Sequence, residues 1–213
     1  MRITVFGAVG NIGSRVVNEA IARGHEVTAV SRDSSKLNGL DPRVKVATGD
    51  INNVEDVIRL TKGQDLVVSA TRPPQGHEYQ LIDITQSLLA GVEKSNVKLL
   101  LVGGAACLTV PNSNGRLVVD DPNYVQDAWK AIALACIEQY QLCVNNPNTQ
   151  WTYMSPPAFI QPGQRTGDYR HHGNELVIDE EGKSHISLED FAVALLDEVE
   201  TPQYANQKFT VGY

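Results

Sequence analysis

The sequence lacks an excess of positive charge: 18 lysines and arginines stand against 25 aspartates and glutamates, giving a net charge of −7 over 213 residues. This balance argues against nucleic acid as a partner. No apolar run is long enough to span a bilayer, because the longest, 99–110, is short and contains two glycines. No secretory signal precedes the first apolar segment, since Met1-Arg2 leads directly into it. We therefore expect a cytoplasmic protein with no membrane partner.

Cysteines are too few for a disulfide framework. The three, Cys107, Cys136 and Cys143, show no metal-ligand spacing. An odd count without a secretory signal indicates free thiols in a reducing compartment. Cys136 and Cys143 lie seven residues apart on an expected helix, so we expect both on one buried face. We predict core packing rather than a redox role, and no metal site.

The first thirty-two residues carry the most informative pattern. An apolar segment, 2–6, is followed at once by a glycine-rich turn, a helical pattern and a second apolar segment, 26–31. This is a strand–helix–strand unit of the kind that binds a dinucleotide. Gly7 would allow a sharp turn, Gly10 would let a pyrophosphate approach the backbone, and Gly13 would let the helix pack close to the sheet.

The start of the expected helix would offer free N–H groups and a partial positive charge to the phosphates. The alternative is a glycine-rich turn in an α/β protein that binds no dinucleotide. We predict the dinucleotide site and assign to it Gly7, Val9, Gly10, Asn11, Ile12 and Gly13.

Strand and helix patterns alternate along the whole chain, whose length suits a single domain, 1–213. The pattern predicts an α/β fold of the Rossmann type, a doubly wound, mostly parallel sheet with helices on both faces. The expected strands are 2–6, 26–31, 44–48, 65–70, 97–102, 151–155 and 207–211. The expected helices are 12–23, 53–61, 78–94, 123–143 and 188–199. Right-handed crossovers favour strand order 3-2-1-4-5-6-7.

Two irregular loops, about 103–122 and 156–175, follow the fifth and sixth expected strands. Both should lie at the carboxyl edge of the sheet and form the substrate walls. Helix starts are also signalled. Asn52-Asn53 can cap the second helix, and Ser187 with an acid three residues later forms a capping-box pattern.

The glycine spacing is GxxGxxG rather than GxGxxG. With the turn Gly7-Ala8-Val9-Gly10, it resembles the extended and atypical short-chain dehydrogenase/reductase families. The segments 65–70 and 99–104 resemble the fourth and fifth strands of that superfamily. Asp50-Ile51 follows the third expected strand, where the superfamily often places an acid that contacts adenine. The alternative role for Asp50 is an N-terminal cap for the next helix.

The end of the second expected strand bears on the cofactor. An NAD-specific site usually has an acid there, whereas this chain has Ser31-Arg32. A guanidinium suits a 2′-phosphate, so we predict NADP in preference to NAD. Asp33 would oppose a phosphate if it faced the site, and it could instead start the following helix. The alternative for Arg32 is a solvated loop charge.

Ala70-Thr71 should pass the cofactor riboses at the end of the fourth strand. Arg72 follows and could reach a phosphate or a substrate carboxylate, or could lie free on the surface. Short-chain dehydrogenases usually place a lysine four residues after the proton-donating tyrosine. Only Tyr204 with Lys208 has this spacing, and it lies on the wrong element. The standard tyrosine–lysine pair is therefore absent, and the catalytic residues stay unassigned.

The second half resembles the biliverdin-IXβ reductase/flavin reductase group and the NAD(P)H-binding, NmrA-like proteins. The resemblance rests on the segments 151–157 and 167–169, together with 30–37, and covers nearly the full chain. It implies that Pro156 contacts the cofactor. The chain departs from the reductase group at Gly104-Ala105, in place of a serine, and at Ala158, in place of a histidine. Neither position can donate a proton.

Several residues are candidates for the substrate pocket. His171 and His172 could donate a proton near neutral pH, although adjacent loop histidines are more often solvated. Trp129 could wall the pocket, although we predict that it packs in the core. Arg165 and Tyr169 could bind substrate or could tie down their loop. The pocket set is Arg72, Gly104, Tyr124, Arg165 and Tyr169.

These observations predict a reductase that transfers hydride from NADPH to a flat, conjugated acceptor of the flavin or quinone type. Such acceptors take hydride readily, and solvent can supply the proton. The alternatives are a non-catalytic NADP-binding sensor of the NmrA-like kind and an epimerase or isomerase. The expected partner is a small-molecule acceptor, with a homodimer as an open alternative.

Overall fold

A parallel sheet runs through the middle of the computed structural model, which describes residues 1–213. Its strand order is β3-β2-β1-β4-β5-β6-β10-β8, and only β8 is antiparallel to its neighbour. These strands are β1 Arg2–Phe6, β2 Glu26–Ser31, β3 Lys45–Thr48, β4 Leu66–Ser69, β5 Lys98–Val102, β6 Trp151–Ser155, β8 Arg170–His172 and β10 Lys208–Gly212. A separate parallel pair joins β7 (Phe159–Gln161) to β9 (His185–Ser187).

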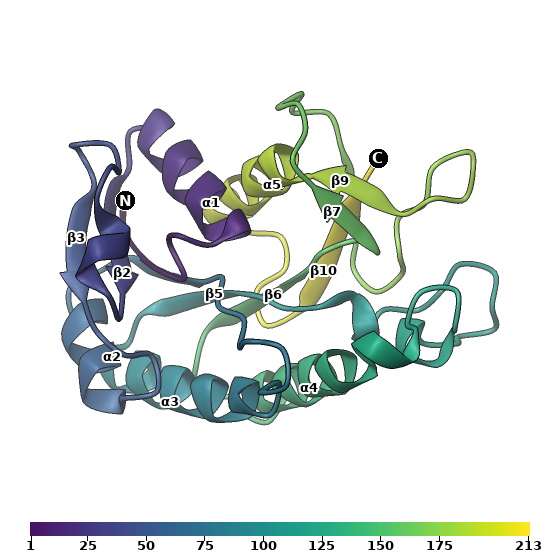
Figure 1. Ribbon diagram of the computed structural model, residues 1–213, viewed down its shortest axis with the longest axis horizontal. Coiled ribbons are helices and arrows are strands. Elements are labelled where there is room, and N and C mark those ends of the chain that lie inside the picture. The colour runs from purple at the N-terminus through teal and green to yellow at the C-terminus, as the bar shows by residue number, and fades with distance from the viewer.

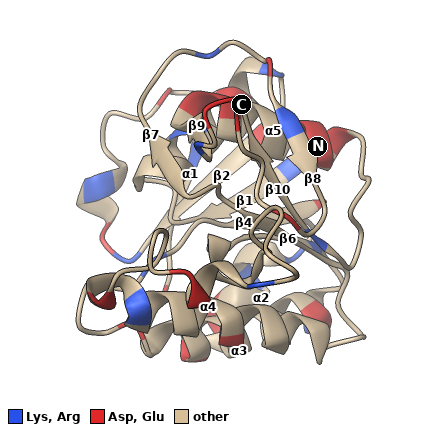
Figure 2. Cartoon of the chain, turned by 90° about the vertical axis from the view of Figure 1, so that its right-hand side faces the viewer, with Lys and Arg blue, Asp and Glu red and all other residues tan.

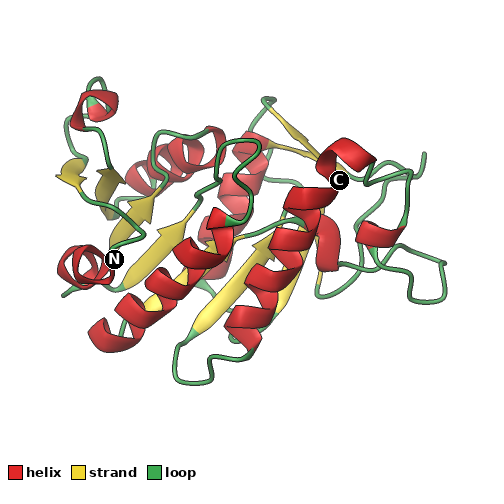
Figure 3. Cartoon of the chain, turned by 60° about the horizontal axis from the view of Figure 1, so that its bottom comes forward, coloured by secondary structure: helices red, strands yellow, loops and turns green.

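Helices cover both faces of the sheet (Figure 1). They are α1 Asn11–Ala22, α2 Val54–Thr61, α3 Gln80–Ser95, α4 Asp127–Val144 and α5 Leu188–Glu200. Helices α1 and α5 pack together on one face, and α2, α3 and α4 lie side by side on the other (Figure 3). Each face has its own core. Phe191 and Leu195 belong to the first, and Leu88 and Tyr153 to the second.

The central strands form because they are apolar throughout. In β1, Ile3, Val5 and Phe6 are all buried, so side chains on both faces of the strand are covered. Strands buried on both faces have continuous apolar runs rather than alternating ones. Charged residues are concentrated on the surrounding helices and loops (Figure 2). None of the helices combines the length and the apolar character needed to cross a bilayer.

The structure confirms the predicted fold class and the strand order 3-2-1-4-5-6-7, with β10 as the seventh strand. Helix α4 begins at Asp127, later than the predicted 123. The reason is a turn at Asp121. The Asp121 carboxylate accepts from the N–H of Asn123 at 3.0 Å, and the Asp121 backbone carbonyl accepts from the N–H of Val125 at 2.9 Å. Strands β7, β8 and β9 were not predicted, because three residues are too few to show a period.

Ser187 caps α5 as predicted, accepting from the N–H of Asp190 at 2.9 Å. The reciprocal half of the capping box is absent. The buried Asp190 carboxylate instead accepts from the N–H groups of Thr166 and Gly167, both at 2.8 Å, and from the hydroxyls of Thr166 and Tyr213, both at 2.6 Å. Burial alone raises the pKa of Asp190, but these four bonds outweigh it and hold the pKa below its ordinary value. One carboxylate thus anchors the 156–175 loop to α5.

This anchor predicts a loss of stability in acid. Because the pKa of Asp190 is lower in the folded state than in the unfolded chain, its contribution is complete above the unfolded value of about 4 and disappears as pH falls through the folded pKa. We expect Asp190→Asn to lower the free energy of unfolding by roughly 1–3 kcal/mol at pH 7 and to flatten its dependence on pH below about 5. Urea unfolding across this range measures both effects.

Asp168→Asn is the matched control, since Asp168 lies on the same loop and is exposed. Its unfolding curves should follow those of the wild-type protein. An Asp190→Asn protein with the wild-type stability and the wild-type acid slope would contradict the role assigned to this carboxylate.

Candidate functional site

The turn between β1 and α1 depends on two glycines that touch backbone. Gly7 has a φ of +79°, and a Cβ there would lie 2.4 Å from the carbonyl oxygen of Ala70. A Cβ on Gly13 would lie 2.1 Å from the carbonyl oxygen of Gly7. Side chains at these two positions would therefore separate β1, β4 and α1. Gly10 differs, since its Cβ would meet nothing closer than the Gly7 oxygen at 3.2 Å.

The start of α1 has free hydrogen-bond donors. Gly10 N–H donates to Gly7 at 2.9 Å, and the next backbone bond of the turn comes from Ser14, which donates to the Gly10 carbonyl at 2.9 Å. The N–H groups of Asn11, Ile12 and Gly13 have no acceptor in the chain, and no side chain caps the helix. Val9, Gly10 and Asn11 are exposed. Exposed, unpaired N–H groups at a helix N-terminus fit the phosphates of a dinucleotide.

The end of β2 places Arg32 on the surface beside Ser31. Asp33 caps a short 3₁₀ turn, Ser34–Leu37. It therefore starts the following helical turn, one of the two roles that the sequence predicted for it. Its carboxylate accepts from the N–H of Ser35 at 3.0 Å and from the hydroxyl of Ser35 at 2.6 Å. These bonds hold the pKa of Asp33 below its ordinary value. The carboxylate is thus engaged within its own turn, while the Arg32 guanidinium has no protein partner.

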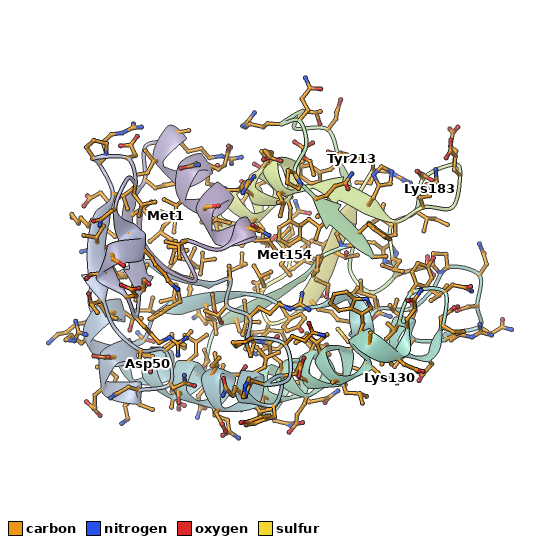
Figure 4. The ribbon with its side chains drawn as sticks, in the orientation of Figure 1. Met1, Asp50, Lys130, Met154, Lys183 and Tyr213 are labelled. Carbon is orange, nitrogen blue, oxygen red and sulfur yellow. The ribbon has the colours of Figure 1, made fainter.

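Asp50 and Ile51 lie beyond β3 at the same edge of the sheet. Asp50 does not cap α2: Asn53 does so, accepting from the N–H groups of Glu55 at 2.9 Å and Asp56 at 3.3 Å. The Asp50 carboxylate uses one oxygen for Asn52, at 3.0 Å from its backbone nitrogen. Its second oxygen stays free for an adenine amino group. Asp50 lies at the left of the molecule in Figure 4, far along the sheet from Tyr213.

A cavity of about 670 Å³ opens at the carboxyl ends of β4, β5 and β6. Six of the predicted site residues beyond the glycine turn lie on its wall: Ala70, Thr71, Arg72, Gly104, Tyr124 and Pro156. The cavity also reaches Ile12 of α1, so the phosphate turn and the cavity share one edge of the sheet. This is the edge at which open α/β sheets bind their ligands.

The prediction that Trp129 packs in the core is wrong. Its side chain is 53% exposed and lines the cavity rather than packing in the core. The Arg72 guanidinium lies 5.6 Å from the centre of its ring, a cation–π contact. The cause is the late start of α4, which leaves Trp129 in the first turn of the helix, beyond the part that the sheet covers.

Tyr153 supports the cavity from inside the sheet. Its buried hydroxyl donates to the carbonyl of Cys136 at 3.0 Å and accepts from the N–H of Gly104 at 3.2 Å. A Cβ on Gly103 would overlap the Tyr153 ring, at 1.9 Å from Cζ, so glycine is needed there. Burial raises the pKa of Tyr153 well above its ordinary value. This hydroxyl fixes the wall and is not a proton donor to the cavity.

The ionisable side chains on the cavity wall are few: Arg72, Tyr124 and Cys136. Burial raises the pKa of the Cys136 thiol to about 12 and also raises the pKa of Tyr124. Cys107 and Cys143 are buried too, and burial raises the pKa of Cys143 to about 12. Core packing of the cysteines is therefore confirmed. No group of three or more His, Cys, Asp or Glu side chains is arranged to hold a metal ion.

Arg165 and Tyr169 do not reach the cavity, which corrects their placement in the substrate pocket. Arg165 pairs with the buried Glu19 of α1 through two bonds of 2.8 and 2.9 Å. Tyr169 donates to Asp197 of α5 at 2.5 Å. The buried Glu19 carboxylate needs partners, and Arg165 supplies two of them. Both residues therefore tie the loop to the helices, the alternative that the sequence left open.

The adjacent histidines also lie away from the cavity. They belong to β8, which pairs with β10 at the edge of the sheet, and His171 bonds the Tyr204 hydroxyl at 2.6 Å. Tyr204 stacks on Phe209, with ring centres 4.6 Å apart. Lys208 instead contacts the carbonyl of Cys107 and the ring of Tyr140. The Tyr204–Lys208 spacing therefore forms no catalytic pair.

The fold and the phosphate turn define a Rossmann-type nucleotide-binding protein. Residues 7–202 match the NAD(P)H-binding family model, and the chain belongs to that family. It is 33% identical over 215 residues to the uncharacterised protein YwnB of Bacillus subtilis, covering 99% of this chain and 98% of that one.

Two solved structures share the whole fold. A proposed epimerase of Bacteroides thetaiotaomicron has a TM-score of 0.92 at 35% identity, covering 100% of this chain and 96% of that one. A proposed NADH-flavin reductase of Streptococcus pneumoniae has a TM-score of 0.88 at 26% identity, covering 100% and 99%. These relatives confirm the resemblance to the atypical short-chain dehydrogenase/reductase and NmrA-like group.

A second cavity, of about 760 Å³, was not predicted. It adjoins the first and is built around β7 and β9, two strands that the sequence did not reveal. The available signal was the polar segment Gln161-Pro-Gly-Gln164 after the sixth strand, which is too polar for the core and too short to be a linker.

Gly10 and Gly13 should respond differently to substitution. We expect Gly10→Val to fold normally but to lose NADPH binding, because its side chain would project from the exposed turn where the phosphates approach. Gly13→Ala should instead destabilise the protein by roughly 1–3 kcal/mol, since its Cβ overlaps the Gly7 carbonyl. Thermal unfolding and NADPH fluorescence titration separate the two effects. Wild-type affinity in a folded Gly10→Val protein would contradict the site.

Proposed function

We propose that this protein is an NADPH-dependent reductase that transfers hydride to a flat, conjugated acceptor of the flavin or quinone type. The supporting observation is the shared edge of the phosphate turn and the 670 Å³ cavity. Of the 25 residues that line this cavity, 16 are hydrophobic and none is a carboxylate or a histidine. Apolar walls with few polar groups suit a planar ring better than a sugar or a charged metabolite.

The residues of the cavity would act by position. The nicotinamide, when bound, supplies the hydride. Pro156, Ala70 and Gly104 would line the space for its ring and for the acceptor, and the Arg72–Trp129 pair would border one side of that space. Alignment of two reacting rings in a dry pocket accounts for much of the barrier reduction in such a transfer.

The cavity wall has few groups that could donate a proton. This scarcity favours acceptors that need no proton at the moment of hydride transfer. Tyr124 is the only hydroxyl acid on the wall with solvent access, and burial together with Asp121 raises its pKa. No lysine stands near it to lower that pKa, as the standard pair would require. Flavins and quinones accept hydride without prior protonation, whereas aldehydes and ketones depend on an acid.

The lack of proton-donating side chains also favours a second candidate, a non-catalytic NADP-binding sensor. In that case the cavity would serve only to register the bound cofactor. The Bacteroides thetaiotaomicron relative is named as a proposed epimerase. An epimerase that used bound NADP would need an acid and a base on the cavity wall. Arg72 and the thiol of Cys136 do not provide them at neutral pH.

Steady-state oxidation of NADPH over pH 5–9 tests the proposal. We expect flavins and quinones to be reduced faster than aldehydes or ketones. Tyr124→Phe and Cys136→Ala should each lower the rate less than the roughly 10²–10⁴-fold expected for loss of a general acid. His171→Ala is the control, since this residue lies away from the cavity. A thousandfold loss in Tyr124→Phe at unchanged cofactor affinity would identify an acid, and no turnover with any acceptor would favour the sensor.

We also propose that the cofactor is NADP rather than NAD, with Arg32 as the residue that discriminates. Arg32 is exposed at the end of β2, and Asp33 beside it is held by Ser35. A guanidinium without a protein partner can form paired, charge-assisted bonds to a 2′-phosphate. Arg32→Ala should weaken NADPH binding about tenfold or more and leave NADH binding nearly unchanged.

Arg2→Ala is the matched control for this experiment. It removes the same charge at the opposite, amino edge of the sheet, where Arg2 pairs with the exposed Asp65. Fluorescence titration of each variant with both cofactors gives the four affinities needed. Equal loss of NADPH and NADH binding in Arg32→Ala, or tighter NADH binding by the wild-type protein, would reject the assignment.

A further inference from the structure

The two cavities adjoin each other. Asn123, Tyr124, Ala158 and Phe159 line both of them. Phe159 marks the boundary: it is the first residue of β7 and is 71% exposed. A second compartment of about 760 Å³ therefore lies beside the cavity at the carboxyl edge of the sheet.

The walls of the two compartments differ in chemistry. The first is mostly apolar, with 16 hydrophobic residues of 25, whereas the second has only 5 of 16. Gln161, Gln164 and Ser184 give the second compartment amide and hydroxyl groups, and Lys183 stands on its rim with a side chain that is 68% exposed. Figure 4 shows Lys183 and Tyr213 on the same side of the molecule. No aspartate or glutamate lines either compartment, although the chain has 25 acidic residues.

The polar compartment is held in place by the fold. Gly163 N–H donates to Glu189 of α5 at 2.8 Å, and the Ser187 hydroxyl donates to the backbone carbonyl of Gln164 at 2.9 Å. The side-chain amides of Gln161 and Gln164 make no hydrogen bond within the protein. The backbone of this wall is thus fixed, while the two exposed side-chain amides keep their donors and acceptors available to a ligand.

We propose that the second compartment binds a polar, hydroxyl-bearing arm of the acceptor whose conjugated ring occupies the first. This inference rests on the proposed function and names the acceptor class more closely. A flavin carrying its ribityl chain matches an apolar compartment followed by one rich in amides and hydroxyls. A quinone with an isoprenoid tail does not, because its tail would remove water from the two glutamine amides without replacing their hydrogen bonds.

Binding of two flavins to the NADP⁺-saturated protein tests this directly. Lumiflavin carries the ring alone, and riboflavin carries the same ring with the ribityl arm. Quenching of flavin fluorescence measures each dissociation constant without any need for turnover. We expect riboflavin to bind roughly five- to thirtyfold more tightly than lumiflavin, as two or three hydrogen bonds to the arm would give.

The double variant Gln161→Leu/Gln164→Leu should bring the two flavins to nearly equal affinity by weakening riboflavin alone. Lumiflavin is the internal control for folding and for the ring compartment. Gln203→Leu is the matched control variant, since Gln203 is exposed and lies outside both cavities. It should keep the wild-type preference for riboflavin.

The outcomes separate this inference from the proposed function. Tighter binding of riboflavin than of lumiflavin, without oxidation of NADPH, would support the arm site and reject the reductase. Reduction of both flavins with equal affinities, or an unchanged preference in the double variant, would overturn the arm site and leave the reductase standing. Failure of both flavins to bind the NADP⁺-loaded protein would overturn the arm site and would leave only quinones as acceptors for the proposed reductase.

Discussion

Close contact between three pieces of backbone is the constraint on which the rest of this structure depends. Gly7 leaves β1 with its α-carbon against the Ala70 carbonyl at the end of β4, and Gly13 of α1 lies against Gly7. Because no side chain separates them, the helix N-terminus, its free N–H groups and the mouth of the ring compartment all meet at one edge of the sheet. The proposed cofactor and acceptor would therefore lie side by side at this edge.

The sequence predicted the parts of the fold that have a long hydrophobic period or a glycine with a defined task. The seven long strands and their order followed from continuous apolar runs and right-handed crossovers, and the turn at Gly7–Gly13 followed from its spacing. The short strands β7, β8 and β9 could not be predicted in this way. They pair because the chain around them is already held by Asp190 and Glu19, and those contacts join residues 24 and 146 positions apart.

The candidate site was predictable to the same extent. Backbone positions fixed by strand ends, such as Ala70, Thr71, Gly104 and Pro156, were placed on the cavity wall from sequence alone. Long side chains on loops were not. Arg165 and Tyr169 have residue types suited to a ligand, yet they bind carboxylates on α1 and α5 instead. Trp129 is the opposite case, a large apolar residue that lines the ring cavity instead of the core. It does so because α4 starts about one turn later than the sequence pattern indicates.

The anchoring of the 156–175 loop has a consequence for how this protein could diverge. The backbone of the segment that floors the polar compartment is held by the β7–β9 pair, by Glu189 and by Ser187. The side chains of Gln161 and Gln164 project from this backbone and belong to neither core. Changes at these two glutamines would alter which molecules are accepted without disturbing the nucleotide turn or the sheet. Ligand choice and folding are thereby assigned to separate parts of one chain.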